Sequence, residues 1–100
     1  MKSRYKYQFV PRYYHLDGNY HDAHPVYLHD DSNMLDAIIM GLDMSRELGT
    51  DVLFFAYSPR AGWQFIHTCH PDGTATNSFG NRQRFTGDRH TYWEPVTPQQ

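Results

Sequence analysis

Cysteine is nearly absent from this sequence, since Cys69 is the only one among 100 residues. A single thiol excludes an intrachain disulfide and a cysteine-based zinc cluster, and it indicates a reducing compartment. Long apolar runs are also missing: the longest, VLFFAY, is far shorter than the roughly 20 residues of a membrane helix. The first ten residues are basic but lack the apolar core of a secretory signal. We therefore expect a cytoplasmic protein that makes no membrane contact.

Recognisable catalytic motifs are missing as well. The sequence has no glycine-rich phosphate loop, no GxSxG turn and no HExxH motif. Cys69 shares a strand face with His67, but two residues along a strand separate them by roughly 7 Å, beyond hydrogen-bond reach. We predict a protein that is not an enzyme and holds no cofactor, with Cys69 as a buried structural residue.

Basic residues are scarce in the middle of the chain. Residues 17–51 contain eight acids and one cation, Arg46, which gives a net charge of −7. Residues 1–16 contain four cations and no acid, and residues 52–100 contain four arginines and three acids. The overall charge of −2 therefore conceals an acidic segment between two mildly basic flanks.

Aromatic residues are abundant, at 16% of the chain, and they favour a folded core. Residues 5–10 alternate as a half-buried strand, which Pro11 would confine to a sheet edge or a bulge. Residues 51–57 do not alternate, which predicts a central strand buried on both faces. Shorter strands are expected at 26–29, 63–69, 74–76, 82–85 and 91–94. We predict one domain over residues 1–95 and a tail at 96–100.

One amphipathic helix is predicted after Ser32 or Asp31, either of which could cap its first turn. Gly49 marks its C-terminal end. Gly41 inside it should cost up to about 1 kcal/mol relative to alanine, and it indicates close approach to an aromatic sheet. The apolar positions at helical spacing are Met34, Leu35, Ile38, Ile39 and Leu42. Together these patterns predict an α+β fold, an antiparallel sheet of about four to six strands with one helix on one face.

The polar face of this helix is acidic. Almost no Lys or Arg is spaced to pair with its acids, so the face is either simply solvated or used for recognition. Met40 would give it an apolar centre within an acidic rim, which suits a basic surface, including one that normally holds a phosphate backbone. We predict a partner-binding site formed by Asp30, Asp31, Asp36, Met40, Asp43 and Glu47.

Histidines supply the first alternative, a metal-dependent enzyme or metal-sensing module built from His21, His24, His67 and His70. Zinc needs three or four converging ligands at about 2 Å. The odd separation of His67 and His70 turns their side chains to opposite faces of a strand. We predict no metal site, because convergence would require the loop at 21–24 to fold over the end of a hairpin.

Aromatic and basic residues near both ends supply the second alternative, a small nucleic-acid-binding domain. Tyr5, Lys6 and Tyr7 would form one patch with Arg82 and Arg84 if the first strand paired near residues 82–85. The acidic net charge opposes this, so we expect direct nucleic-acid binding to be weak or absent.

Residues 31–95 place DSNMLDAIIMGLDMSRELG before DVLFFAY, GWQFIHTCH and TYWEP in one compact chain. In this build the chain resembles the small anti-CRISPR proteins of phages and mobile elements. The resemblance implies an inhibitor that covers a working surface of a CRISPR effector in the host cytoplasm. The implied partner is a protein with a basic surface, such as an effector subunit, and no binding residue is carried over from that family.

Overall fold

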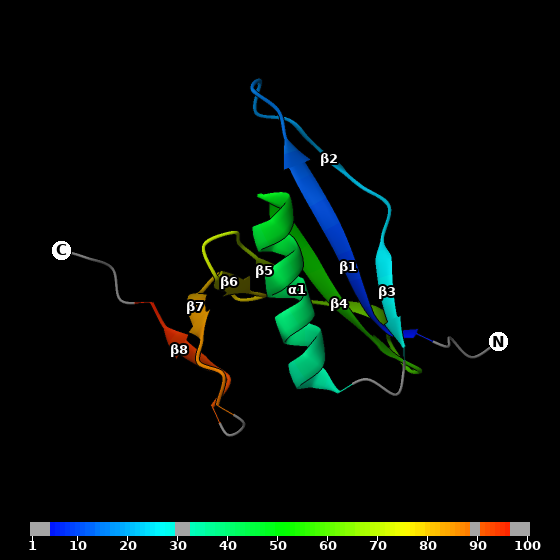
Figure 1. Cartoon of the computed structure of the whole chain (residues 1–100). Helices are drawn as coiled ribbons and strands as arrows, with labels where there is room; N and C mark the ends of the chain where they lie inside the picture. Colours follow the sequence, from blue (N-terminus) through cyan, green and yellow to red (C-terminus); the bar gives the residue numbers. More distant parts are fainter. Residues whose placement is uncertain (1–4, 30–32, 89–90, 97–100) are drawn as a thin grey trace.

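The computed structural model describes residues 5–29, 33–88 and 91–96, and it shows one helix packed on an eight-stranded antiparallel sheet (Figure 1). The predicted α+β class is confirmed, and the strand number exceeds the predicted four to six. The elements are β1 (Tyr5–Tyr14), β2 (Tyr20–Asp22), β3 (Val26–His29), α1 (Met34–Leu48), β4 (Asp51–Ser58), β5 (Gly62–Cys69), β6 (Thr74–Asn77), β7 (Arg82–Phe85) and β8 (Trp93–Pro95). Their order in the sheet is β2-β1-β4-β5-β6-β7-β8, and β3 pairs with the first half of β1 on the same side as β2.

Strand β1 runs through the interior of the sheet, so of the two predicted settings for Pro11 the sheet edge is wrong, whereas a bulge-like irregularity is present: residues 10–11 face residues 23–25 between the pairs Phe9–Val26 and Arg12–Asp22. One side of β1 pairs with β4 along residues 7–12, and Pro11 itself lies opposite Val52. The other side pairs with two short strands, β3 and β2, which leave a break between them. The carbonyl of Pro11 accepts from the amide of Ala23 at this break. The ring nitrogen of Pro11 points toward this break as well. The N–H that proline lacks would therefore not have bonded to β4, and the pairing of β1 with β4 is complete without it.

Helix α1 covers the middle of the sheet across β1, β4 and β5 (Figure 1). Asn33 caps the N-terminus of the helix, where its Oδ1 accepts a hydrogen bond from the amide of Asp36 at 2.8 Å. The predicted caps were Ser32 or Asp31. Gly49 ends the helix in the left-handed conformation, as predicted. A Cβ at Gly41 would lie 3.0 Å from Cys69 Sγ and 3.2 Å from the ring of Phe9. The predicted close approach of the helix to the sheet is thereby confirmed.

The core lies between α1 and one face of the sheet. Its fully buried side chains include Tyr7, Phe9, Phe54, Val52 and Cys69. Strand β4 alternates, because Val52 and Phe54 are buried under the helix while Leu53 and Phe55 are only half-buried. The prediction that β4 is buried on both faces is therefore wrong, since among the described residues no second helix or sheet covers the other face. We call that other face the open face.

Ordered structure extends slightly past the predicted domain boundary at residue 95. Val96, placed in the predicted tail, still donates its amide to the carbonyl of Arg82, so ordered pairing continues one residue past the expected boundary. Within the described residues, no helix is both long and apolar enough to cross a membrane.

Candidate protein-binding site

The outer surface of α1 contains a hollow of about 390 Å³. Four of its lining residues are the predicted Asp36, Met40, Asp43 and Glu47, and Ile39 and Met44 complete it. We call these six residues the helix groove. The predicted Asp30 and Asp31 lie outside the described residues. The four predicted residues that the structure describes therefore lie together on one surface of the helix, as expected from their spacing.

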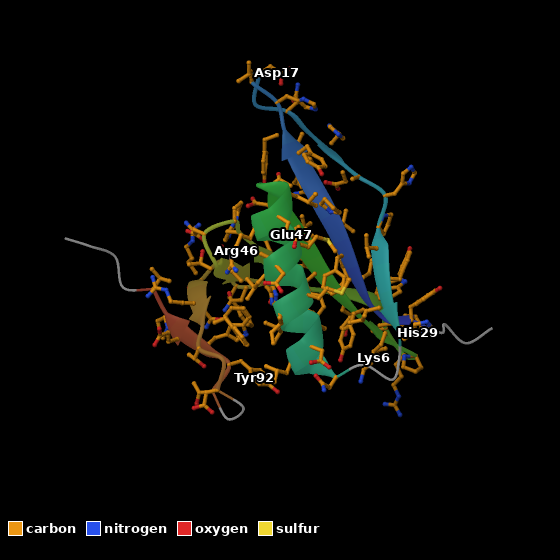
Figure 2. The ribbon with its side chains drawn as sticks, viewed as in Figure 1. Lys6, Asp17, His29, Arg46, Glu47 and Tyr92 are labelled. Atoms are coloured by element: carbon orange, nitrogen blue, oxygen red, sulfur yellow. The ribbon has the colours of Figure 1, made fainter. Side chains whose placement is uncertain are left out.

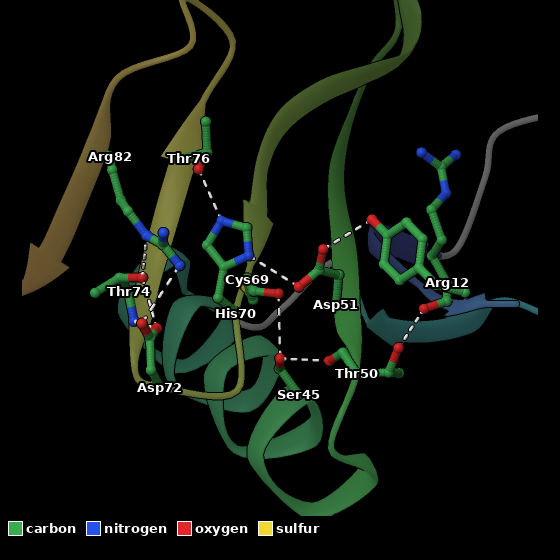
Figure 3. Close-up of polar contacts among 11 residues, drawn as sticks. Arg12, Ser45, Thr50, Asp51, Cys69, His70, Asp72, Thr74, Thr76 and Arg82 are labelled. Atoms are coloured by element: carbon green, nitrogen blue, oxygen red, sulfur yellow. Dashed lines mark hydrogen bonds and ion pairs between the residues drawn. The ribbon is translucent and has the colours of Figure 1, made fainter. Parts of the chain in front are cut away.

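The inner face of α1 determines this orientation. Ala37, Ile38, Gly41, Leu42 and Ser45 are buried toward the sheet, so the acidic positions point outward. Ser45 anchors the C-terminal end by donating from Oγ to the carbonyls of Thr50 at 2.6 Å and Cys69 at 3.1 Å (Figure 3). Packing and hydrogen bonds therefore fix the orientation of α1 about its axis, and with it the direction in which the groove faces.

The floor of the groove is apolar and adaptable. Met40 and Met44 are half-buried, and Ile39 remains 41% exposed. Methionine has three rotatable bonds and a polarisable sulfur, so it repacks around differently shaped apolar groups. Ile39 and Met44 were not predicted as site residues, because Ile39 falls at core spacing in the sequence and Met44 has no charge that marks it as part of the acidic face.

The rim of the groove keeps most of its negative charge. Arg46 is the one cation of α1, and its Nη1 lies 3.8 Å from Asp43 Oδ1. Both side chains are more than half exposed, so the attraction is screened by water and holds neither in place. Asp36 and Glu47 have no ion pair among the described residues, and Figure 2 shows Glu47 on the outer side of the helix. A cation brought to this rim would find carboxylates that are free to reorient.

The open face carries a hydrogen-bonded cluster that the sequence did not reveal. Asp51 Oδ1 lies 2.8 Å from His70 Nδ1, and His70 Nε2 lies 2.7 Å from Thr76 Oγ1 (Figure 3). Tyr14 donates its hydroxyl to Asp51 Oδ2 at 2.8 Å. The order hydroxyl, imidazole, carboxylate matches a nucleophile triad.

Acyl transfer also needs N–H donors that converge on an oxyanion beside the nucleophile. Thr76 lies in β6, which pairs with β5 on one side and β7 on the other, so its neighbouring backbone groups belong to the sheet ladders. We interpret the cluster as a link that ties β4, the end of β5 and β6 together.

The histidines of the metal hypothesis do not come together. His67 is buried beneath α1 and Trp93, whereas His70 lies on the open face as part of the Asp51 cluster. His21 stacks on His15 in the β1–β2 hairpin, and His24 is exposed in the following connection. Within the described residues, no group of three or more His, Cys, Asp or Glu side chains is placed to hold a metal ion.

His67 and Cys69 are instead parts of the core. His67 lies between the rings of Phe54 and Trp93, at centroid distances of 4.9 and 5.1 Å. Its burial, with a smaller contribution from His70, lowers its pKa to about 4. Burial, with a smaller contribution from Asp51, raises the pKa of the Cys69 thiol to about 12. The thiol is therefore protonated and enclosed at neutral pH, as predicted for a structural cysteine.

The basic clusters of the nucleic-acid hypothesis do not merge. Strands β4, β5 and β6 separate β1 from β7, so Lys6 is remote from Arg82 and Arg84. Tyr7 is fully buried under α1, and Arg82 is bound to Thr74 and Asp72 at 2.8 and 3.3 Å. The condition for a joint patch of Tyr5, Lys6, Tyr7, Arg82 and Arg84 is therefore not met, because the first strand pairs with β4 instead of β7.

Comparison of the chain with protein-family models, curated proteins and solved structures finds no match.

Proposed function

We propose that this protein is a non-enzymatic, protein-binding inhibitor whose helix groove binds a cationic, amphipathic segment of its partner. The single observation that carries the proposal is the groove itself, in which three carboxylates surround an apolar floor of Ile39, Met40 and Met44. An amphipathic helix places apolar anchors and cations three to four residues apart, which suits a groove of this kind.

Charge supports the choice of partner. The rim has three acids and one weakly held arginine, so it attracts a basic segment and repels an acidic one. Attraction of this kind raises the association rate and is weakened by salt. The apolar floor would then hold the bound segment, because burial of apolar side chains does not depend on salt.

Inhibition is the consequence we propose for such binding. A basic surface that holds a phosphate backbone is also a surface that an acidic rim can occupy, and both ligands cannot be bound at once. A nucleic-acid-binding subunit of a CRISPR effector in the host cytoplasm is a partner of this type, in line with the resemblance of the chain's build to anti-CRISPR proteins.

The test compares two variants of equal net charge. Asp36→Lys with Asp43→Lys changes the rim, and Asp17→Lys with Glu94→Lys changes exposed acids elsewhere, one at the hairpin tip in Figure 2 and one on β8. A partner is captured from host lysate with the wild-type chain, and its affinity for all three proteins is measured at low salt. We expect at least a tenfold loss for the rim variant and a much smaller loss for the other. Equal affinities would contradict the proposal, and melting curves check that both variants fold.

A further inference from the structure

The open face carries a second surface feature that the proposed function does not use. Four rings form a continuous series at the end of the sheet where β3, the start of β1 and the β4–β5 turn meet: Tyr5, Tyr27, Trp63 and Tyr57. Successive centroids are 5.2, 5.8 and 5.3 Å apart. We call this series the aromatic platform.

Strand register explains why these rings share one face. Tyr57 lies directly opposite Trp63 and follows Ala56, which packs against the core under α1. Tyr5 pairs with His29, and a register shift separates it from the buried Tyr7. Tyr27 lies opposite Gln8, which alternates with the buried Tyr7 and Phe9. Because α1 covers the other face, the platform opens to solvent.

The platform is large and accessible. Tyr5 is 41% exposed and Tyr27 is 42% exposed, while Trp63 and Tyr57 are half-buried. Phe65, which is 38% exposed, lies against Phe55 with their centroids 5.8 Å apart and extends the apolar area along β5. The Tyr5–Tyr27 and Tyr27–Trp63 pairs are tilted by 32° and 49° and the Tyr57–Trp63 pair is edge-on, so the rings do not cover one another's faces in parallel stacks.

The surroundings of the platform are basic. The described segments that form this end of the molecule, residues 5–9, 26–29 and 55–64, contain no Asp or Glu, and Asp30 and Asp31, which follow His29 in the sequence, lie outside the described residues. Lys6, His29 and Arg60 are exposed there, and Lys6 Nζ lies 5.6 Å from the ring centroid of Tyr7. Among the described residues, neither Lys6 nor Arg60 forms an ion pair. The described acids lie on α1, in the β1–β2 hairpin, at the start of β4 and in the segment from the β5–β6 turn to β8.

We propose that the aromatic platform binds single-stranded nucleic acid, with bases stacked on Tyr27 and Trp63 and phosphates contacting Lys6 and Arg60. Rings that accept any base and exposed cations are the two parts of such a surface. A duplex fits less well, because its bases are already stacked on one another and its length would bring it near the acidic helix. This surface differs from the patch of the nucleic-acid alternative in using Tyr27, Trp63 and Arg60 in place of Tyr7, Arg82 and Arg84.

The experiment titrates the full chain into a fluorescently labelled oligothymidine and a labelled duplex of equal length at about 50 mM salt. Tyr27→Ala and Trp63→Ala should each weaken single-strand binding by about 5- to 150-fold, the range that corresponds to loss of one stacked base. Lys6→Ala with Arg60→Ala should flatten the dependence of affinity on salt. Phe79→Ala is the matched control, since Phe79 is 88% exposed in the β6–β7 turn, and it should bind normally.

The edge-strand variant Tyr27→Ala and the charge variant keep the test decisive if Trp63→Ala fails to fold. A second readout uses the Trp93→Phe background, in which quenching of Trp63 fluorescence reports stacking directly. Absence of single-strand binding, equal affinity for the duplex, or the same loss with Phe79→Ala would overturn the proposal. Formation of a dimer that Trp63→Ala disrupts, without oligonucleotide binding, would overturn it as well.

Discussion

The two faces of this sheet differ in what covers them, and the difference separates stability from recognition. The face under α1 buries Phe9 and Phe54 completely, and their stacked rings lie 5.3 Å apart. The open face leaves rings of comparable size, such as Phe65 and Tyr27, about two-fifths exposed. Burial of apolar area is the main favourable term in folding. The covered face therefore stabilises the domain, and the open face remains available for other contacts.

The largest expected effect on stability comes from replacing one phenylalanine on each face of the sheet. Phe54→Ala removes a ring with no exposed area, so we expect a loss of about 3–5 kcal/mol in the free energy of unfolding. Phe65→Ala removes a ring that is 38% exposed in the folded state, and its loss should be about 1 kcal/mol. Urea unfolding followed by circular dichroism measures both. Similar losses for the two variants would contradict the division of roles.

The next effect in size is the dependence of stability on pH through His67. Its pKa is about 4 in the folded protein and 6.5 when unperturbed, so between these values the unfolded chain binds a proton that the folded chain does not. Its contribution is therefore complete above pH 6.5 and is lost as the pH falls toward 4. The loss amounts to about 3 kcal/mol.

His67→Phe is the matched variant for this prediction. It keeps a ring between Phe54 and Trp93 and removes Nε2, a buried atom without a hydrogen-bond partner among the described residues. The variant should be at least as stable as the wild type at pH 7 and should lose less stability between pH 6.5 and 4. Unchanged pH dependence in His67→Phe would show that another group is responsible.

A smaller effect tests the contact between helix and sheet. Gly41→Ala introduces a Cβ at 3.0 Å from Cys69 Sγ, and we expect it to cost about 1–2 kcal/mol despite the better helix propensity of alanine. Adding Cys69→Ala removes the sulfur, so the double variant should lose less than the sum of the two single losses. A double-mutant cycle measures this coupling, and strict additivity would count against the close contact.

The smallest effect concerns the polar cluster on the open face. Thr76→Val keeps the shape of the side chain and removes the hydrogen bond to His70 Nε2. We expect a loss of about 1 kcal/mol in the free energy of unfolding, the usual net value of one such bond. Thermal melting at pH 7 is sufficient to measure it. A loss above about 3 kcal/mol would mean that the cluster has a larger structural role than its partial burial indicates.

The sequence predicted those parts of the fold that depend on local pattern. The predicted features include the helical spacing from Met34, the helix end at Gly49 and the close packing at Gly41. Each of them depends on only a few neighbouring residues. Features that depend on which distant strands pair with one another could not be predicted from local pattern. Pro11 is accommodated in an interior strand because β2 and β3 leave a break beside it, and the pairing of β1 with β4 follows from the whole sheet order.

The candidate site shows the same division. Asp36, Met40, Asp43 and Glu47 could be placed together because one helix carries all four. The aromatic platform could not be predicted, because its rings come from four strands that meet only in the assembled sheet. The Asp51–His70–Thr76 cluster was missed for the same reason, since its members belong to β4, the β5–β6 turn and β6.

Site-specific photo-crosslinking tests the central claim, that the helix groove is where a protein partner binds. A photoreactive phenylalanine analogue replaces Ile39 in the groove in one protein, and Phe65 on the open face or Phe79 in the β6–β7 turn in two others. All three positions are exposed, at 41%, 38% and 88%. The account predicts a cross-link from position 39 to a basic, amphipathic segment of the captured partner, with position 79 unreactive. Cross-linking of the partner from position 65 but not from position 39 would contradict it.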